Sequence, residues 1–401
     1  MSVELLAPAG NLEKAKTAIR YGANAVYIGG QEFSLRSRAS NFSIDQIREL
    51  CLFAHERNAK VHVTVNIIPH PSDFEGLKAY FKALDEAGID AIISASPSII
   101  RKAKQGGYGF QVHVSTQRSI LNEEAVRFWK KQGADRVVLG RETPIESIAE
   151  ICSKDIADIE VFIHGGMCIS YSGRCVLSNH MTNRDANRGG CAQSCRWKYQ
   201  LDDESGEISN PDIPFSMSSR DLQSVRHVAG LIQAGAVSLK IEGRMKSDYY
   251  LAVVVGAYRR LIDAIESDPY KSVDEAFLQE IAQEIARAEN RPTGPGFYEG
   301  LPDENVQLYT RHDENVTQEY IGLVEEVLDD SRLKVIVKNH FEDHTPVELF
   351  GPSIAPYKTV LDGIEDEEGT PLAVCPHPMQ KVILNWTGSA KAGAMIRKQR
   401  K

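Results

Sequence analysis

Four of the seven cysteines lie within one short stretch, residues 163–199. Six residues separate Cys168 from Cys175, fifteen separate Cys175 from Cys191, and three separate Cys191 from Cys195. The intervening sequence is rich in Gly, Asn and Ser, which is typical of a loop. Thiolates repel one another, and this loop has few large apolar residues to hold it together. A shared metal ion or cluster would give the thiolates a reason to converge.

The cysteine spacing leaves four interpretations open. Disulfides suit a secreted chain, but the opening sequence lacks the basic and apolar segments of a signal peptide, so we expect a cytoplasmic protein. Zinc usually binds paired cysteine knuckles, and only Cys191 and Cys195 have that spacing. Iron–sulfur clusters accept looser spacing. The loop therefore favours a cluster, with zinc, disulfides and unligated core cysteines as the alternatives.

The overall composition excludes a general affinity for nucleic acid. The chain has 401 residues, 42% of them hydrophobic and 25% charged, with a net charge of −9. No apolar run is long enough to span a membrane, so we expect no membrane contact. Any RNA contact must be local. Two segments are locally basic: residues 164–199, with Arg174, Arg184, Arg188, Arg196 and Lys198 against the single acid Asp185, and the last eleven residues, with Lys391, Arg397, Lys398, Arg400 and Lys401. For the tail, a frayed and solvated end is the alternative.

A helix-to-strand unit recurs along the first 241 residues. An amphipathic run ends at a glycine and leads into a β-branched strand at Gly22, Gly88, Gly133 and Gly235. Each glycine stands where a helix needs a left-handed residue at its end. Further strands are expected at residues 4–7, 60–66, 111–116 and 160–164. Eight strands alternating with helices predict an α/β fold of the (β/α)8 TIM-like barrel type. A doubly wound sheet is the alternative, but residues 7–11 lack its G-x-G-x-x-G phosphate loop.

Catalytic groups of such a barrel lie at the C-terminal ends of its strands. The polar residues expected there are Glu32, Arg36, Asn66, Ser115, Gln117, Arg141, Glu142, His164, Lys240, Glu242 and Arg244. The cysteine loop follows the seventh strand and should cover the same mouth. We predict catalytic roles for Arg141, Glu142, Lys240, Glu242 and Arg244, because charges share a buried pocket only with partners or a charged ligand. The alternative is that Arg141–Glu142 and Glu242–Arg244 form mutual salt bridges that only close the rim.

The composition changes at the Pro- and Gly-rich residues 291–296. We therefore predict two domains, a catalytic barrel over residues 1–290 that includes the cysteine loop and a β-rich domain over residues 291–401. Alternating runs at 320–327, 333–337, 346–350 and 381–384 predict the strands of a small β-barrel. His62 and His113 are expected to be core or rim histidines rather than ligands. Cys375 and His377 are expected to form a rigid turn rather than a metal site.

The residues around the cysteines resemble a known family. Residues 160–168 and 173–178 are similar to the motif of the collagenase-like peptidase family U-32. The resemblance extends over nearly the whole chain, and one departure is Gly166, where the family has Ser or Ala. Within that family, residues 183–191 and 195–197 resemble the tRNA hydroxylation branch.

The resemblance implies a specific chemistry. Cys168, Cys175, Cys191 and Cys195 would be the ligands of a 4Fe-4S cluster. Prephenate would be the co-substrate, and the wobble uridine in the anticodon loop of tRNA would become 5-hydroxyuridine. A dicarboxylate such as prephenate suits bidentate Arg side chains. The Arg-rich loop beside Trp197 and Tyr199 suits an unstacked RNA base.

The peptidase activity in the family name is the alternative function. A serine or cysteine protease needs a nucleophile, a base and an orienting group, and many metalloproteases show H-E-x-x-H. Neither pattern is recognisable in the sequence. A third interpretation is a non-enzymatic iron–sulfur scaffold or tRNA-binding adaptor.

Overall fold

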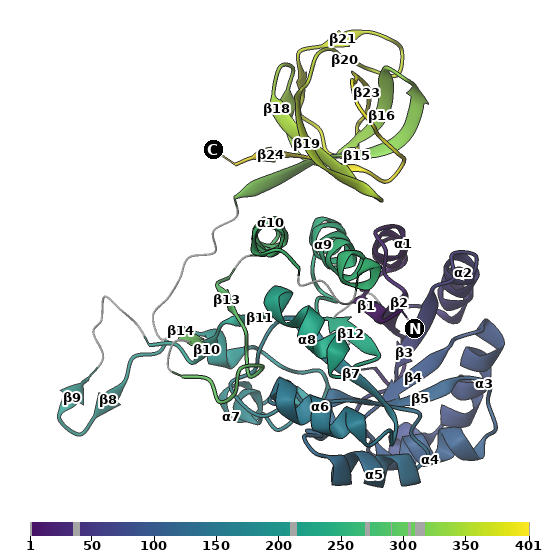
Figure 1. The fold of residues 1–401 in the computed structure, drawn as a ribbon, viewed down its shortest axis with the longest axis vertical. Helices are drawn as coiled ribbons and strands as arrows, with labels where there is room; N and C mark the ends of the chain where they lie inside the picture. The colour runs from purple at the N-terminus through teal and green to yellow at the C-terminus, as the bar shows by residue number, and fades with distance from the viewer. Residues whose placement is uncertain are drawn as a thin grey trace.

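The chain folds into a closed barrel of parallel strands followed by an antiparallel sheet (Figure 1). The computed structural model describes residues 2–34, 41–208, 215–268, 273–289, 291–303, 306–308 and 317–400. Eight strands close the barrel because the last of them pairs with both the first and the seventh. The predicted TIM-like fold is therefore confirmed.

All eight predicted barrel strands are present. They are β1 (Glu4–Pro8), β2 (Ala25–Gly29), β3 (Lys60–Thr64), β4 (Ala91–Ser94), β5 (Gln111–Val114), β6 (Arg136–Val138), β7 (Asp158–Gly165) and β12 (Ser238–Ile241). Their register places Glu4 opposite Ser238 and Ser238 opposite Glu160. The side chains of these three residues thus start from neighbouring positions near the N-terminal end of the barrel.

Helices surround the barrel and begin and end where the sequence supplies caps. They are α1 (Leu12–Arg20), α2 (Ile44–His55), α3 (Leu77–Ala87), α4 (Pro97–Gln105), α5 (Glu123–Lys131), α6 (Ile145–Ser153), α8 (Val228–Gln233), α9 (Asp248–Ser267) and α10 (Glu275–Ala286). Asn11, Ser43 and Asn122 accept backbone N–H bonds at helix starts. The four glycines predicted to end helices have φ between 84° and 103°, as a left-handed residue requires.

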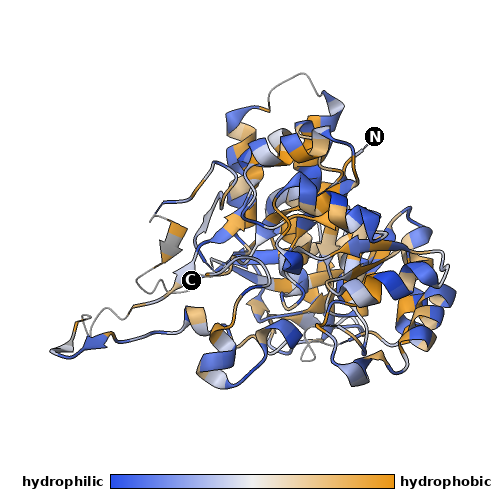
Figure 2. Ribbon diagram, turned by 90° about the horizontal axis from the view of Figure 1, so that it is seen from below, coloured by the Kyte–Doolittle hydropathy of each residue, from blue (hydrophilic) through white to orange (hydrophobic). Residues whose placement is uncertain are grey.

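Most of the apolar core lies on the strands and on the helix faces that cover them. Leu5, Val26, Val63 and Leu239 have no exposed surface. Figure 2 shows mostly hydrophobic strands at the centre and helices that alternate between hydrophobic and hydrophilic residues. In the described ranges, no helix has the length and apolarity needed to cross a membrane.

A long insertion separates β7 from β12. It contains α7 (Leu177–Thr182), the hairpin of β8 (Asp202–Asp203) and β9 (Gly206–Glu207), β10 (Ser218–Ser219) and β11 (Asp221–Gln223). β11 runs antiparallel to the end of β7, with Leu222 opposite Gly165. The β8–β9 hairpin projects away from the barrel (Figure 1).

The predicted domain boundary at residue 290 stays a prediction. Two short strands beyond it, β13 (Thr293–Gly294) and β14 (Gln307–Leu308), pair with β11 and β10 of the insertion. β13 and β14 thus help to build the region beside the cysteine loop.

The C-terminal sheet has eight antiparallel strands. In spatial order these are β19 (Ile354–Val360), β18 (Pro346–Gly351), β24 (Met395–Gln399), β15 (Gln318–Asp329), β16 (Arg332–Val337), β23 (Lys381–Asn385), β20 (Ile364–Glu365) and β21 (Pro371–Leu372). A small separate pair joins β17 (Phe341–Glu342) to β22 (Val374–Cys375). The sheet curls round its own apolar core (Figure 1). The four strands predicted from alternation are all present.

The basic C-terminal tail is neither frayed nor open to RNA at Arg397. This residue lies on β24 with no exposed surface, and its guanidinium donates to both carboxylate oxygens of Glu284 at 2.7 and 2.8 Å. It also donates to Glu348 at 2.9 Å. Because Glu284 lies on α10 and Glu348 on β18, Arg397 ties the C-terminal sheet to the barrel helices. Both interpretations of the tail are wrong for this residue.

Candidate cluster site at the barrel mouth

The cysteine loop begins at the C-terminal end of β7, above the barrel. Gly165 has φ 116°, and a Cβ atom there would lie 2.6 Å from the Glu242 side chain, so only glycine lets the chain pass this point. Cys175 precedes α7, whereas Cys195 lies in a short 3₁₀ turn, Ser194–Arg196. Cys175 and Cys195 therefore lie on separate, locally folded segments of the loop.

Hydrogen bonds inside the loop hold these segments together. The Ser178 hydroxyl accepts from the Ala192 amide at 3.0 Å and lies 3.9 Å from the Cys191 Sγ. The Gly190 amide donates to the Asp185 carbonyl at 2.7 Å. The Tyr199 hydroxyl donates to the Ser194 carbonyl at 2.6 Å. The loop is thus ordered by its polar residues, which replace the missing apolar core.

All seven cysteines are free thiols, so the disulfide interpretation has no support. Burial raises the pKa of the Cys168 thiol to about 11, with further increases from Cys191 and Cys195, while Arg141 opposes the shift. Burial also raises the pKa of Cys195, and Cys191 and Cys175 add to it. Each of the four thiols therefore lies within electrostatic range of at least one other.

The thiols do not surround a single point. Across the residues that the structure describes, no three His, Cys, Asp or Glu side chains are placed to ligate one metal ion. Four thiols in one loop are compatible with a multi-iron cluster, since each thiolate of such a cluster binds a different iron.

Arg141 lies directly beneath the loop. Its guanidinium donates to the Glu242 carboxylate at 2.5 Å and to the Gly166 carbonyl at 2.7 Å, and it stacks 3.9 Å from the centre of the Phe162 ring. Burial opposes its charge, but the Glu242 carboxylate raises the pKa of Arg141 overall. Arg141 therefore connects β6, β7 and β12 at the base of the loop.

The salt bridge that does form at the rim joins the two motifs considered above. Arg141 pairs with Glu242 instead of its neighbour Glu142. Glu142 accepts hydrogen bonds from the Ser172 amide at 2.8 Å and from its hydroxyl at 3.1 Å, and so contacts the cysteine loop. The roles predicted for Arg141, Glu142 and Glu242 stay predictions, but all three lie at the mouth.

Lys240 does not lie at the mouth, and its predicted position is wrong. Its side chain points into the barrel, 4% exposed, and its ammonium donates to Glu160 at 2.6 Å. Glu160 also accepts from Arg136 at 3.1 Å, and Arg136 pairs with Glu4 at 2.5 Å. Burial would raise the pKa of Glu160, but Lys240 and Arg136 lower it to about 2. The barrel interior thus contains a closed ionic network.

Two histidines complete this interior, as expected for core residues. The rings of His62 and His113 meet edge to face at 4.9 Å. Burial lowers the pKa of His62 to about 4 and that of His113 well below its usual value. Both rings are therefore neutral at physiological pH.

Arg244 lies at the β2–β3 side of the mouth, beside Thr64, and is 5% exposed. It donates to the hydroxyls of Ser34 and Thr64 at 3.3 and 3.4 Å and to the Asn41 side-chain oxygen at 3.4 Å. A Cβ atom on Gly29 would lie 2.0 Å from the guanidinium, so glycine leaves room for this side chain. Arg244 is thus a buried mouth residue, and not an exposed rim charge.

The other residues predicted to lie at the mouth differ in their contacts and in their burial. The Asn66 amide donates to the Gln117 side chain at 2.8 Å, and the Ser115 hydroxyl donates to the same oxygen at 3.1 Å. His164 is buried instead, 3.4 Å from the Tyr258 hydroxyl. Glu32 is exposed. Arg36 lies outside the described residues.

The arginines proposed to contact RNA are not equivalent. Arg188 pairs with Asp73 at 2.7 Å, and Arg196 lies 3.5 Å from Asp221. Arg174 and Arg184 are exposed. Several large apolar and aromatic side chains of the loop region are also exposed and were not predicted: Ile169, Tyr171, Val176 and Met181.

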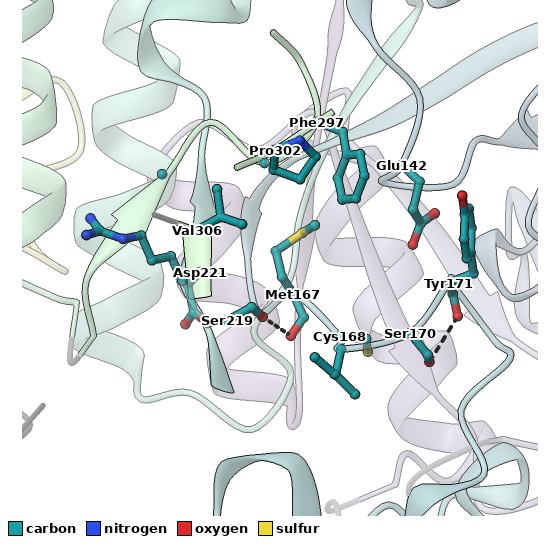
Figure 3. A pocket seen from close by; sticks show the side chains of 14 residues that line it. Glu142, Met167, Cys168, Ser170, Tyr171, Ser219, Asp221, Phe297, Pro302 and Val306 are labelled. Atoms are coloured by element: carbon teal, nitrogen blue, oxygen red, sulfur yellow. Dashed lines mark hydrogen bonds between the residues drawn. The ribbon is translucent and has the colours of Figure 1, made fainter. Parts of the chain in front are cut away.

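A cavity of about 130 Å³ opens beside the loop, and sequence reasoning missed it. Figure 3 shows Glu142, Cys168 and Tyr171 on one side and Phe297, Pro302 and Val306 on the other. The second group comes from the segment around β13 and β14. No sequence signal marked this segment, because the pairing that brings it to the loop is long-range.

Comparison with known proteins agrees with the motif resemblance. The sequence pattern of Peptidase family U32 matches residues 10–308, and that of the family's C-terminal domain matches residues 316–397. The chain is 45% identical to tRNA hydroxylation protein P1 of Bacillus subtilis, an alignment covering 98% of this chain and 94% of that protein.

More distant relatives have two kinds of name. The tRNA hydroxylation protein P of Escherichia coli is 30% identical, with 93% of this chain and 91% of that protein covered. A collagenase of Porphyromonas gingivalis is 33% identical, with 74% and 73% covered. With the family pattern spanning both parts of its fold, this chain belongs to peptidase family U32.

Proposed function

We propose that this protein modifies tRNA, converting the wobble uridine to 5-hydroxyuridine with prephenate as co-substrate. The observation that carries the proposal is the near full-length similarity to tRNA hydroxylation proteins, 45% identical over 98% of the chain for the Bacillus subtilis protein. The four-thiol loop over the barrel mouth adds a physical reason for a cofactor at that place.

A 4Fe-4S cluster is the proposed cofactor, held by Cys168, Cys175, Cys191 and Cys195. The free thiols, their mutual electrostatic effect and their spread around the loop support this ligand set. Bound there, the cluster would supply redox or Lewis-acid chemistry next to the mouth. The Arg141 guanidinium beside Cys168 would offset negative charge on the thiolates.

The mouth offers a place for an anionic co-substrate at its β2–β3 side. Arg244 is buried there among the oxygens of Ser34, Thr64 and Asn41. A buried guanidinium binds a carboxylate more strongly than an exposed one, because water competes less. We therefore assign one prephenate carboxylate to Arg244.

The exposed face of the cysteine loop is the proposed tRNA contact. Arg174 and Arg184 are accessible to phosphates, and Trp197 is 42% exposed and able to stack on a base. An acidic protein can hold RNA through such a local group, since affinity depends on the phosphates neutralised at the contact.

The nucleosides of tRNA from cells that lack this protein test the proposal. We expect 5-hydroxyuridine and its derivatives to disappear and to return when the wild-type gene is supplied. A Cys191→Ser variant should fail to restore them, whereas Cys152→Ser, a change on α6 outside the loop, should restore them. Unchanged 5-hydroxyuridine in cells lacking every protein of this family would contradict the proposal.

A collagenase-like peptidase is the second candidate, because the Porphyromonas gingivalis relative bears that name. The barrel histidines give it little support. His113 contacts Gln111, and His164 contacts Tyr258 and lies 3.7 Å from Glu289. Gelatin digestion by holoprotein and by a variant without the four loop cysteines tests this function. We expect no cleavage by either, and cluster-independent cleavage would favour the peptidase.

A further inference from the structure

The cavity beside the cysteine loop is distinct from the set of four thiols that we propose as cluster ligands. Of the four loop cysteines only Cys168 lines it. Its other walls come from the loop after Cys168 and from the segment that carries Phe297 and Val306. Because Cys168 and the mouth residue Glu142 both line the cavity, it lies next to the proposed cluster, where a substrate could be presented to it.

The size and the walls of the cavity suit one flat ring. Its volume is about 130 Å³, and apolar cavities of about 150 Å³ hold a benzene-sized ring. The rings of Phe297 and Tyr171 and the Met167 side chain form much of its wall (Figure 3). Aromatic walls of this kind stack on nucleobases.

The described residues of the lining include more acidic than basic side chains, which disfavours a dianion such as prephenate. Among the residues that the structure describes, Glu142 and Asp221 line the cavity, and Arg220 is the single lining cation. Asp221 is offset by Arg196 and Arg291, each 3.5 Å away. The Glu142 carboxylate accepts hydrogen bonds from Ser172, a neutral partner. The negative charge of Glu142 would repel a carboxylate ligand, whereas it would not repel a neutral ring with an N–H group.

Glu142 retains acceptor capacity that such an N–H group could use. One of its oxygens accepts from the Ser172 amide and hydroxyl, and the other accepts only a longer bond, 3.2 Å, from the same hydroxyl. An ionised carboxylate has about four acceptor positions. Glu142 lines the cavity with Phe297 and Tyr171, and in the view of Figure 3 its carboxylate is drawn between them, so it could meet the edge of a ring held in the cavity.

We propose that this cavity receives one flipped-out pyrimidine base of the RNA substrate, with Glu142 accepting the ring N–H and Tyr171 and Phe297 contacting the ring faces. The assignment rests on the proposed RNA-modifying function. It gives Glu142 a role in choosing the base and leaves the anionic co-substrate to the Arg244 side of the mouth. Extruding a base in this way is how enzymes reach an atom within a stacked strand.

The test measures binding, so that it does not depend on turnover. Two anticodon stem-loop RNAs differ only at the wobble position, with uridine in one and 3-methyluridine, which has no ring N–H, in the other. Their dissociation constants are measured with anaerobic holoprotein at one salt concentration. We expect wild-type protein to bind the uridine RNA about 10- to 100-fold more tightly, the range for a hydrogen bond to a charged group.

The Glu142→Ala variant should bind the two RNAs within about threefold of each other, because the acceptor is gone. Glu146→Ala, which removes an exposed carboxylate on α6, is the matched control and should keep the wild-type preference. Full wild-type discrimination by Glu142→Ala would overturn the proposal. Iron content and far-UV circular dichroism show whether the variant still has its fold and cofactor.

A second variant keeps the proposal testable if Glu142→Ala disturbs the loop through Ser172. Tyr171 is 54% exposed, so Tyr171→Ala should fold. It should weaken binding of the uridine RNA roughly 5- to 100-fold through lost stacking, while Phe128→Ala, a change of an exposed aromatic on α5, should not. Unchanged RNA affinity in Tyr171→Ala, or loss of prephenate binding instead, would overturn the proposal.

The outcomes separate this proposal from the function on which it rests. Glu142-dependent preference for uridine without any 5-hydroxyuridine formation would keep the base pocket and reject the hydroxylase. Formation of 5-hydroxyuridine with a preference independent of Glu142 would reject the base pocket alone.

Discussion

The interior and the mouth of the barrel are both built from Glu, Arg and Lys, yet they differ in how their charges are satisfied. In the interior, Lys240 and Glu160 are almost fully buried and pair at 2.6 Å within a closed network. At the mouth, Arg141 and Glu242 pair beneath an exposed cysteine loop. Lys240 and Glu242 are only two residues apart in sequence. Depth in the barrel, more than residue type, therefore separates structural charges from candidate functional ones.

The largest expected effect is on the free energy of unfolding and comes from a substitution in the barrel interior. Lys240→Met should lower the free energy of unfolding by about 3–5 kcal/mol, because it leaves the Glu160 carboxylate buried beside one remaining cation. Chemical denaturation of the anaerobic holoprotein measures this. Lys154→Met, which breaks an exposed pair with Glu123, should cost less than about 1 kcal/mol. A similarly small loss in Lys240→Met would mean that the interior network is not a structural unit.

The interior should also make stability depend on pH. His62 has an ordinary pKa near 6.5 in the unfolded chain, but about 4 in the folded protein because it is buried and near Arg136 and Lys240. Between these values the unfolded chain binds more protons, so stability falls as the pH is lowered. From pH 6.5 to 5 this histidine should remove about 2 kcal/mol. A His62→Asn variant should lose correspondingly less over that range, and equal losses would argue against a buried neutral ring.

A smaller stability effect is expected at the mouth. Glu242→Gln leaves Arg141 with a neutral partner in a partly open site, and should lower the free energy of unfolding by about 1–2 kcal/mol. Tm by calorimetry and product formation are measured together. We expect product formation to fall much more than stability does. A stability loss as large as that of Lys240→Met would remove the distinction between mouth and interior.

The smallest expected effect is on tRNA affinity and comes from substitutions on the surface of the cysteine loop. Replacing Arg174 or Arg184 by Ala should weaken tRNA binding a few-fold and reduce the slope of log affinity against log salt by about 0.7–0.9 per lost phosphate contact. Arg188→Ala is the internal comparison, because Arg188 already pairs with Asp73. Titrations at several salt concentrations check this. If Arg188→Ala has the larger effect, the RNA approaches from the Asp73 side.

Sequence reasoning predicted the fold well because the barrel repeats a local signal. The glycines that end helices and the β-branched strands after them are short-range features, and the eight strands are where they were expected. It was less successful with β24, because Met-Ile-Arg-Lys-Gln has the composition of a solvated tail. Burial of Arg397 depends on Glu284, a partner 113 positions earlier in the chain.

The parts of the site that need one residue type, such as cysteine, could be predicted from the sequence. The parts that depend on which residues of neighbouring strands lie side by side could not. Four cysteines in one loop indicate a thiol site without any structure. The depth of Lys240 depends on strand alternation and on the Glu160 partner across the β7–β12 pairing. The cavity depends on the pairing of β13 and β14 with β11 and β10 of the insertion, which no local pattern indicates.

Formation of 5-hydroxyuridine by the purified protein tests the central claim most directly. Anaerobically purified holoprotein, about four irons per chain, is incubated with unmodified tRNA and prephenate, and the digested nucleosides are measured by mass spectrometry. We predict 5-hydroxyuridine at the wobble position with wild-type protein, and none with Cys191→Ser or without prephenate. Modification that is unaffected when all four loop cysteines are replaced would contradict the account.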